Sequence, residues 1–106
     1  MHESYEVRTG KYAQMYFKLY KSDKRLGMYQ QIDQRNGNLL SYEVTLLKYQ
    51  KASEFPKGVF REAKWISPTE RDWGVLGWTY LDGNDAEVRY SKLIEEGKHE
   101  FPEPKE

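Results

Sequence analysis

Residues 11–21, KYAQMYFKLYK, alternate with little slippage between two kinds of side chain. Successive side chains of a β-strand point to opposite faces of its sheet, so this alternation predicts a strand with two different sides. One side is apolar and is expected to face a core. The other carries tyrosines and a lysine where a solvated strand usually has Thr, Glu or Lys. The two sides are Ala13, Met15, Phe17 and Leu19, against Tyr12, Gln14, Tyr16, Lys18 and Tyr20.

Two turn signals extend this strand into a three-stranded antiparallel meander. Strands are predicted at 12–20, 28–34 and 40–49, joined at SDKR (22–25) and at RNGN (35–38), where Asn-Gly accepts positive φ at little cost. A slip of one residue reverses every side chain, so the apolar pattern selects the register, and it pairs Leu19 with Met28 and Ile32 with Tyr42. The predicted core face comprises Ala13, Met15, Phe17, Leu19, Met28, Ile32, Leu40, Tyr42, Val44 and Leu46.

The second half of the chain predicts two further strands, at 59–66 and 75–81, with a capping box at SPTE (67–70) between them. Residues 86–94 fit either the second strand of a hairpin or a helix capped by Asp85 and ended by Gly97. We favour the helix because Ala86, Tyr90 and Leu93 share one helical face.

These elements predict an α+β fold, in which an antiparallel sheet of about five strands carries one C-terminal helix on one face. Residues 1–97 are expected to form a single domain and residues 98–106 a polar, mobile tail. The chain has no cysteine, no apolar run long enough to cross a membrane and no signal-peptide pattern, so we expect a cytoplasmic protein that does not bind membranes.

Charge is balanced overall, with 17 basic and 17 acidic residues, but it is unevenly distributed. Residues 1–51 hold nine Lys or Arg and five Asp or Glu, so the first half is basic and the second half acidic. Such an asymmetry can steer an acidic partner toward the first half, although scatter in a charged surface produces it too.

Few residues suit catalysis or metal binding. His2 and His99 lie near the two ends, and the glycines are not spaced as in phosphate-binding or dinucleotide-binding loops. We therefore predict no metal, no cofactor and no enzymatic activity. Glu43 is the one carboxylate placed in mid-strand among tyrosines. An enzyme built on it is a third hypothesis, which a deep pocket around Glu43 would favour.

The aromatic and basic residues on the second side of the sheet give the main functional hypothesis. We call this predicted surface the tyrosine face. Tyrosine-rich surfaces of low charge are favoured in protein interfaces, so the leading prediction is a module that binds a protein partner or a second copy of itself. The alternative is binding of single-stranded nucleic acid, with bases stacked on the rings and phosphates on lysine and arginine. The predicted binding residues are Tyr16, Lys18, Tyr20, Tyr29, Gln31, Glu43 and Tyr49, with phosphate contacts from Lys21, Lys24, Arg25 and Arg35.

The segment SPTERDWGVLGWTYLDGNDAEVRYSKL carries a resemblance to known proteins. A capped turn, Trp73-Gly74, a Trp78-Thr79-Tyr80 strand and an acidic-capped helix resemble the C-terminal half of small phage or mobile-element proteins, over residues 42–96. That resemblance implies a bacterial or phage cytoplasmic setting and a factor that acts on a host protein. It contains no catalytic motif, and no functional residue is carried over from it.

Overall fold

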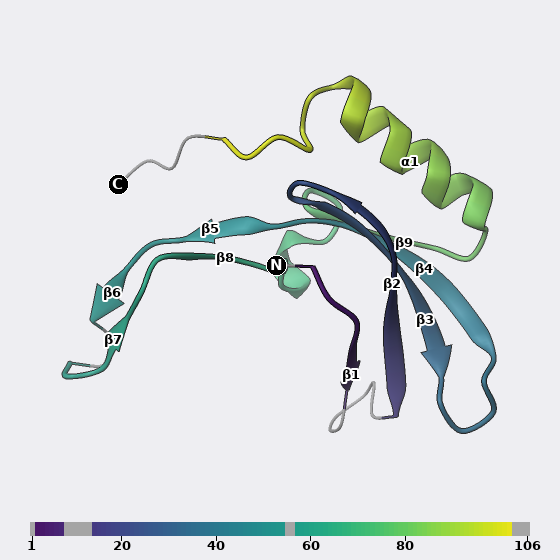
Figure 1. The fold of residues 1–106 in the computed structure, drawn as a ribbon, viewed down its shortest axis with the longest axis horizontal. Coiled ribbons are helices and arrows are strands. Elements are labelled where there is room, and N and C mark those ends of the chain that lie inside the picture. Colours follow the sequence, from purple (N-terminus) through teal and green to yellow (C-terminus); the bar gives the residue numbers. More distant parts are fainter. Residues whose placement is uncertain (1, 8–13, 55–56, 103–106) are drawn as a thin grey trace.

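The computed structural model describes residues 2–7, 14–54 and 57–102 and confirms the α+β fold. One antiparallel sheet has the strand order β1-β2-β3-β4-β9, and one helix, α1, packs on it (Figure 1). The predicted start of the first strand, including Tyr12 and Ala13, lies outside the described residues. The sheet strands and the helix are β1 (Tyr5–Val7), β2 (Met15–Asp23), β3 (Leu26–Asp33), β4 (Leu39–Leu46), β9 (Gly77–Tyr80) and α1 (Gly83–Glu95).

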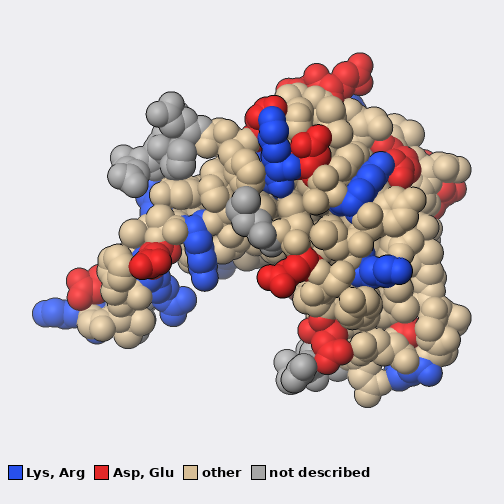
Figure 2. All heavy atoms as spheres, viewed as in Figure 1, with Lys and Arg blue, Asp and Glu red and all other residues tan. Residues whose placement is uncertain are grey.

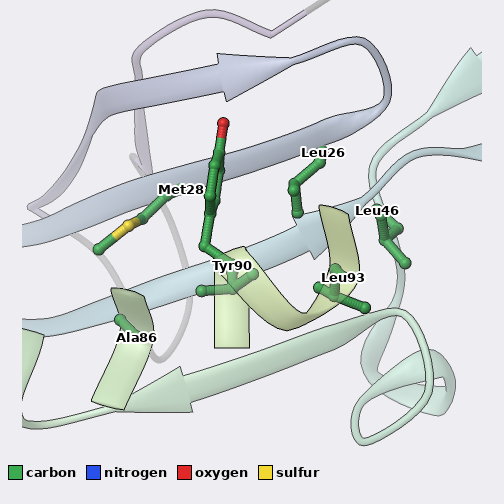
Figure 3. Close-up of a cluster of buried hydrophobic side chains, with 7 residues drawn as sticks. Leu26, Met28, Leu46, Ala86, Tyr90 and Leu93 are labelled. Atoms are coloured by element: carbon green, nitrogen blue, oxygen red, sulfur yellow. The ribbon is translucent and has the colours of Figure 1, made fainter. Parts of the chain in front are cut away.

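The C-terminal helix forms as predicted and covers one face of β3, β4 and β9. Its N-cap is Asp82, whose Oδ1 accepts a hydrogen bond of 2.7 Å from Asn84 N, so the prediction of Asp85 as the cap was three residues late. Gly97 follows the helix with φ of 73°, a left-handed conformation that glycine adopts without strain. The core beneath the helix consists of Leu26, Met28, Val44, Leu46, Ala86, Tyr90 and Leu93 (Figure 3).

The register predicted for the first hairpin is wrong. Leu19 pairs with Tyr29 rather than with Met28, because a two-residue turn at 24–25 joins Asp23 directly to Leu26. Lys24 enters this turn with φ of 55°, and a β-bulge interrupts the pairing between Leu19 and Lys21. Met15, Phe17 and Leu19 therefore face away from the helix, where Met15 and Phe17 form a second cluster with Tyr29.

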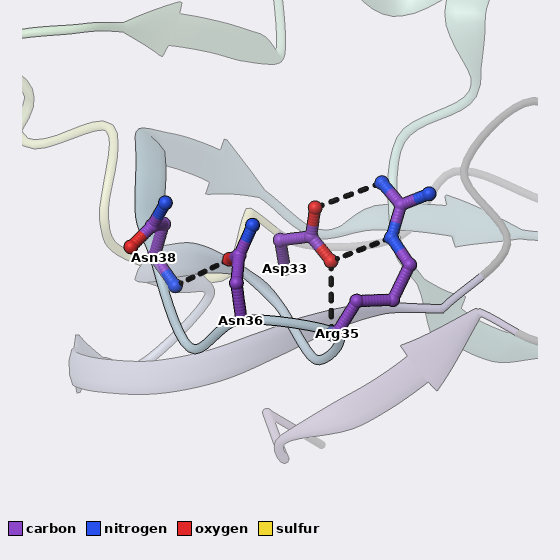
Figure 4. Close-up of polar contacts among 4 residues, drawn as sticks. All are labelled: Asp33, Arg35, Asn36 and Asn38. Carbon is purple, nitrogen blue, oxygen red and sulfur yellow. Dashed lines mark hydrogen bonds and ion pairs between the residues drawn. The ribbon is translucent and has the colours of Figure 1, made fainter.

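The register predicted for the second hairpin is wrong as well. Ile32 pairs with Leu39 rather than with Tyr42, and an irregularity lies between Gln31 and Ile32. The connecting loop is held by Asp33, whose carboxylate accepts hydrogen bonds from the backbone N and the guanidinium of Arg35 (Figure 4). Leu40, predicted in the core, is consequently 42% exposed at the strand start.

Residues 48–66 form a separate two-stranded arm that leaves the main sheet (Figure 1). The predicted connection at 50–58 thus holds a strand, and the predicted strand at 59–66 is broken into two. At the base of the arm the rings of Tyr49 and Trp65 pack at 5.4 Å, and Phe101 meets Trp65 at 4.9 Å. The strands of the arm are β5 (Lys48–Gln50), β6 (Ser53–Glu54), β7 (Phe60–Arg61) and β8 (Lys64–Ile66).

The segment between the arm and β9 contains a single 3₁₀ turn, η2 (Glu70–Asp72). Thr69, not Ser67, is its cap: Asp72 Oδ2 accepts hydrogen bonds from both N and Oγ1 of Thr69, at 2.7 and 2.9 Å. The Lys48 ammonium lies 2.8 Å from the same oxygen and, with Thr69, lowers the pKa of Asp72 to about 2. The turn is thereby fixed to the base of the arm.

Residues 98–102, predicted as part of a tail outside the domain, pack against the first hairpin. Arg25 N donates to His99 O at 3.1 Å, and Arg25 Nε donates to Lys98 O at 2.8 Å. Together with the contact between Phe101 and Trp65, these bonds extend the domain past its predicted boundary.

Candidate functional site

The residues of the predicted tyrosine face do not share one surface. Tyr16, Lys18 and Tyr20 lie on the helix side of β2, since Lys18 pairs with Gln30 and Tyr20 lies beside Met28. Tyr29, Gln31 and Glu43 lie on the opposite side. Tyr49 belongs to the arm. The prediction of one continuous face is therefore wrong, because it depended on the register of the first hairpin.

Two of the predicted binding residues are interior. The Tyr29 side chain is only 5% exposed, its hydroxyl lies 3.2 Å from His2 Nδ1, and burial raises the pKa of this phenol. Gln31 is buried, and its Oε1 accepts a hydrogen bond of 2.7 Å from Ser41 Oγ. Neither side chain is available to a partner in this arrangement.

The four predicted phosphate contacts all bind other parts of the chain. Lys21 lies 2.5 Å from Glu87 Oε2 and over the ring of Tyr90. Lys24 forms an ion pair with Glu100, and Arg25 binds backbone carbonyls of the C-terminal segment and of Leu47. The Arg35 guanidinium lies 2.8 Å from Asp33 Oδ2 and holds the pKa of that carboxyl below its usual range.

Glu43, in contrast, lines a pocket of about 400 Å³ on the side of the sheet away from the helix. The lining residues, Glu43 included, come from five separate parts of the chain that the fold brings together. The side chain projects from the middle of β4, where it pairs with Tyr29 of β3 and with Thr79 of β9. The lining residues are Tyr5, Val7, Phe17, Glu43, Pro68, Thr69, Glu70, Trp73 and Thr79.

One wall of the pocket is a stack of aromatic rings. Tyr5 and Phe17 are direct partners across β1 and β2, and their rings stack with centroids 4.9 Å apart and planes inclined by 16°. Tyr5 also meets the edge of Tyr29 at 5.9 Å. Phe17 is buried, whereas Tyr5 is 44% exposed, so this wall runs from the interior to the surface.

The opposite wall is Trp73, which follows η2. Its Nε1 donates a hydrogen bond of 3.0 Å to Thr79 Oγ1, and its ring lies against Gly77. Trp73 also forms an isolated parallel bridge with Gly77. The indole is thus fixed on β9, at Gly77 and at Thr79, the residue that pairs with Glu43, and it remains 38% exposed.

The electrostatics of the pocket favour a cation. Burial raises the pKa of Glu43 from 4.5 to about 7, and among the described residues no donor forms a hydrogen bond with its carboxylate. Burial, and then the charge of Glu43, raise the pKa of Tyr5 well above its usual range. Glu70 adds a second carboxylate at the pocket, and the lining residues that the structure describes include no Lys, Arg or His.

Of the residues that line the pocket, only Glu43 was among the predicted site residues. Phe17 was assigned to the core beneath the helix, and Tyr5 and Trp73 were assigned no role. The available signal was the alternation itself: with the correct register, Phe17 and Glu43 fall on the same side of the sheet. Nothing local in the sequence places Trp73 near Glu43, since 30 positions and the whole arm separate them.

The described residues contain no group of three or more His, Asp or Glu side chains placed to hold a metal ion. Within the same residues, no helix has the length and apolar character needed to cross a membrane.

Comparisons with protein-family models, with curated proteins and with solved structures find no match to this chain. The resemblance to phage or mobile-element proteins therefore stays a prediction.

Proposed function

We propose that this protein is a non-enzymatic interaction module that takes a basic side chain of a protein partner into the pocket around Glu43. The observation that supports this most strongly is a carboxylate in a pocket with the rings of Tyr5, Phe17 and Trp73, where the described lining residues include no basic side chain. A cation over an aromatic face is stabilised by about 0.5–2 kcal/mol, more as water is excluded. A lysine or arginine also carries an apolar stem that suits such walls.

A ligand cation compensates for the unfavourable burial of Glu43. The carboxylate has lost part of its hydration and has gained no hydrogen bond among the described residues, which is why its pKa is raised. A positive charge beside it favours the ionised form and returns the pKa toward its ordinary value. Binding and ionisation of Glu43 are therefore linked, and affinity for a cation should rise between about pH 6 and pH 8.

A binding role fits the site better than the two other hypotheses. The enzyme hypothesis is favoured by a pocket around Glu43. The pKa of Glu43, about 7, also suits proton transfer near neutral pH. However, no described His, Ser, Thr, Lys or Tyr forms a hydrogen bond with Glu43 that would let the two act as a pair. Single-stranded nucleic acid on the tyrosine face needs Tyr16, Lys18 and Tyr29 on one surface, and the sheet separates them.

The proposal is tested by titrating the protein with three blocked amino acids: N-acetyl-lysine methylamide, the corresponding arginine compound, and the neutral glutamine compound as control. The indole NMR signal of Trp73, assigned with Trp73→Phe, reports the pocket. We expect the lysine or arginine compound to shift this signal at pH 8, with a weaker effect at pH 6, and Glu43→Gln to remove the shift. Equal shifts from the glutamine compound, or none from any of the three, would overturn the proposal.

A further inference from the structure

The arm formed by residues 48–66 differs from the rest of the molecule in charge. It holds five basic residues and two acidic ones, a net charge of +3, so the remainder of the chain carries −3. Figure 2 shows the arm standing apart from the body, with Lys and Arg side chains along it. A molecule with a basic extension and an acidic body has complementary surfaces for a second copy of itself.

The basic side chains of the arm are available. Lys51, Lys57, Arg61 and Lys64 are exposed, and within the described residues none of them forms an ion pair. Lys48, at the base, is the exception, because it binds Asp72 and fixes the arm to η2. The outer part of the arm therefore presents basic side chains that no ion pair among the described residues neutralises.

The outer end of the arm also exposes apolar surface. Phe60 is 69% exposed and Val59 is 45% exposed, and Phe60 is followed directly by Arg61. Aromatic rings and arginine are both enriched in protein interfaces, so an exposed Phe-Arg pair at the end of an extension suits contact with a partner. The surface that suits this end is an aromatic one with a negative charge.

The pocket around Glu43 is such a surface. Its lining combines three aromatic rings with Glu43 and Glu70, and none of its lining residues comes from the arm of the same chain. In Figure 1 the arm leads away from β1 and β2, which supply Tyr5, Val7 and Phe17 to the pocket. Figure 2 shows open space between the arm and the body that another molecule can enter.

We propose that the arm of one copy enters the Glu43 pocket of a second copy, with Lys57 or Arg61 on the carboxylate and Phe60 against the pocket rings. This inference rests on the proposed function and names the partner. Each contact uses one arm and one pocket. Two such contacts related by a two-fold axis close a symmetric dimer, whereas a head-to-tail arrangement that does not close gives longer assemblies.

The test is complementation between two variants that are each defective in one half of the contact. The arm variant is Lys57→Glu/Arg61→Glu, and the pocket variant is Glu43→Gln. Sedimentation is measured at pH 8 and concentrations up to about 1 mM, because a contact of one or two side chains is weak. We expect the wild type to associate and each variant alone to associate at least about tenfold more weakly, which corresponds to about 1.4 kcal/mol. An equimolar mixture of the two should recover a 1:1 dimer, since it contains one intact arm and one intact pocket.

The matched control is Lys18→Glu/Lys92→Glu, which makes the same change in net charge at exposed lysines outside the arm. It should associate as the wild type does. Circular dichroism confirms that every variant is folded.

Three results would overturn the inference. A wild type that stays monomeric while its pocket still binds the lysine compound refutes the arm as the partner and leaves the proposed function intact. Association that persists in both variants places the interface elsewhere. Loss of binding to duplex DNA in the arm variant, with no change in self-association, identifies the arm as a surface for nucleic acid instead.

Discussion

The indole ring of Trp73 lies directly against the backbone of Gly77. A Cβ atom at position 77 would be 2.6 Å from both Cε3 and Cζ3 of the ring, closer than side chains pack. Because Trp73 also donates its Nε1 hydrogen to Thr79, the ring is held in place from two sides. The absence of a side chain at Gly77 therefore allows Trp73 to form the outer wall of the pocket.

Gly77→Ala should displace Trp73 and destabilise the protein. Forcing an extra methyl group into a filled space costs about 1–3 kcal/mol. Urea denaturation measures the loss, and the Trp73 indole NMR signal reports the movement of the ring. The control is the double variant Gly77→Ala/Trp73→Ala, in which the alanine has room. If Gly77→Ala costs as much in the Trp73→Ala background as in the wild type, the close contact is not the cause.

Glu43→Gln should change how stability depends on pH. Burial raises the pKa of Glu43 from 4.5 to about 7, so the folded protein binds this proton more tightly than the unfolded chain does. The free energy of unfolding of the wild type, relative to that of Glu43→Gln, is therefore highest below about pH 4.5. This advantage of the wild type is lost as pH rises to about 7. One pKa unit is worth about 1.4 kcal/mol, so the difference should change by roughly 3 kcal/mol. Denaturation of both proteins between pH 4 and pH 8 measures it, and a constant difference would contradict the assignment.

The fold could be predicted from the sequence because its strongest signals are local. Alternation identified β2 and placed Met28 and Val44 in the core beneath the helix, and helical periodicity identified Ala86 and Leu93 on the buried side of α1. These patterns depend on single elements and not on how the elements pair.

The candidate site could not be predicted in the same way, because it depends on register. The first hairpin turns at Lys24, which has φ of 55° but carries none of the glycine or asparagine signals of a tight turn. The β-bulge near Tyr20 adds one residue to β2 and so shifts which residues face the helix. The alternating pattern of the sequence therefore also fits the wrong pairing of the first hairpin. Trp73 lies near Glu43 only because β9, which follows the arm in the sequence, pairs with β4.

Leu93→Ala should be strongly destabilising, and Val88→Ala on the same helix should not. Leu93 is 1% exposed in the core beneath α1, whereas Val88 is 68% exposed. Truncating a buried leucine costs about 2–5 kcal/mol, through lost burial and the cavity left behind. An exposed substitution usually stays within about 0.5 kcal/mol. Thermal or urea denaturation compares the two variants. Equal losses of stability would mean that a different face of the helix is buried.

Arg25→Ala should lower stability, because Arg25 joins the first hairpin to the C-terminal segment. Its guanidinium donates to Lys98 O at 2.8 Å and to Leu47 O at 3.3 Å. Hydrogen bonds from a charged donor contribute about 1.5–3 kcal/mol, so a loss of about 1–3 kcal/mol is expected in urea denaturation. Lys24→Ala is the neighbouring control: its ion pair with Glu100 is half exposed, and such pairs contribute about 1 kcal/mol or less. If Arg25→Ala leaves stability unchanged and instead weakens binding to a polyanion such as heparin, Arg25 is a phosphate contact, as the sequence alone suggested.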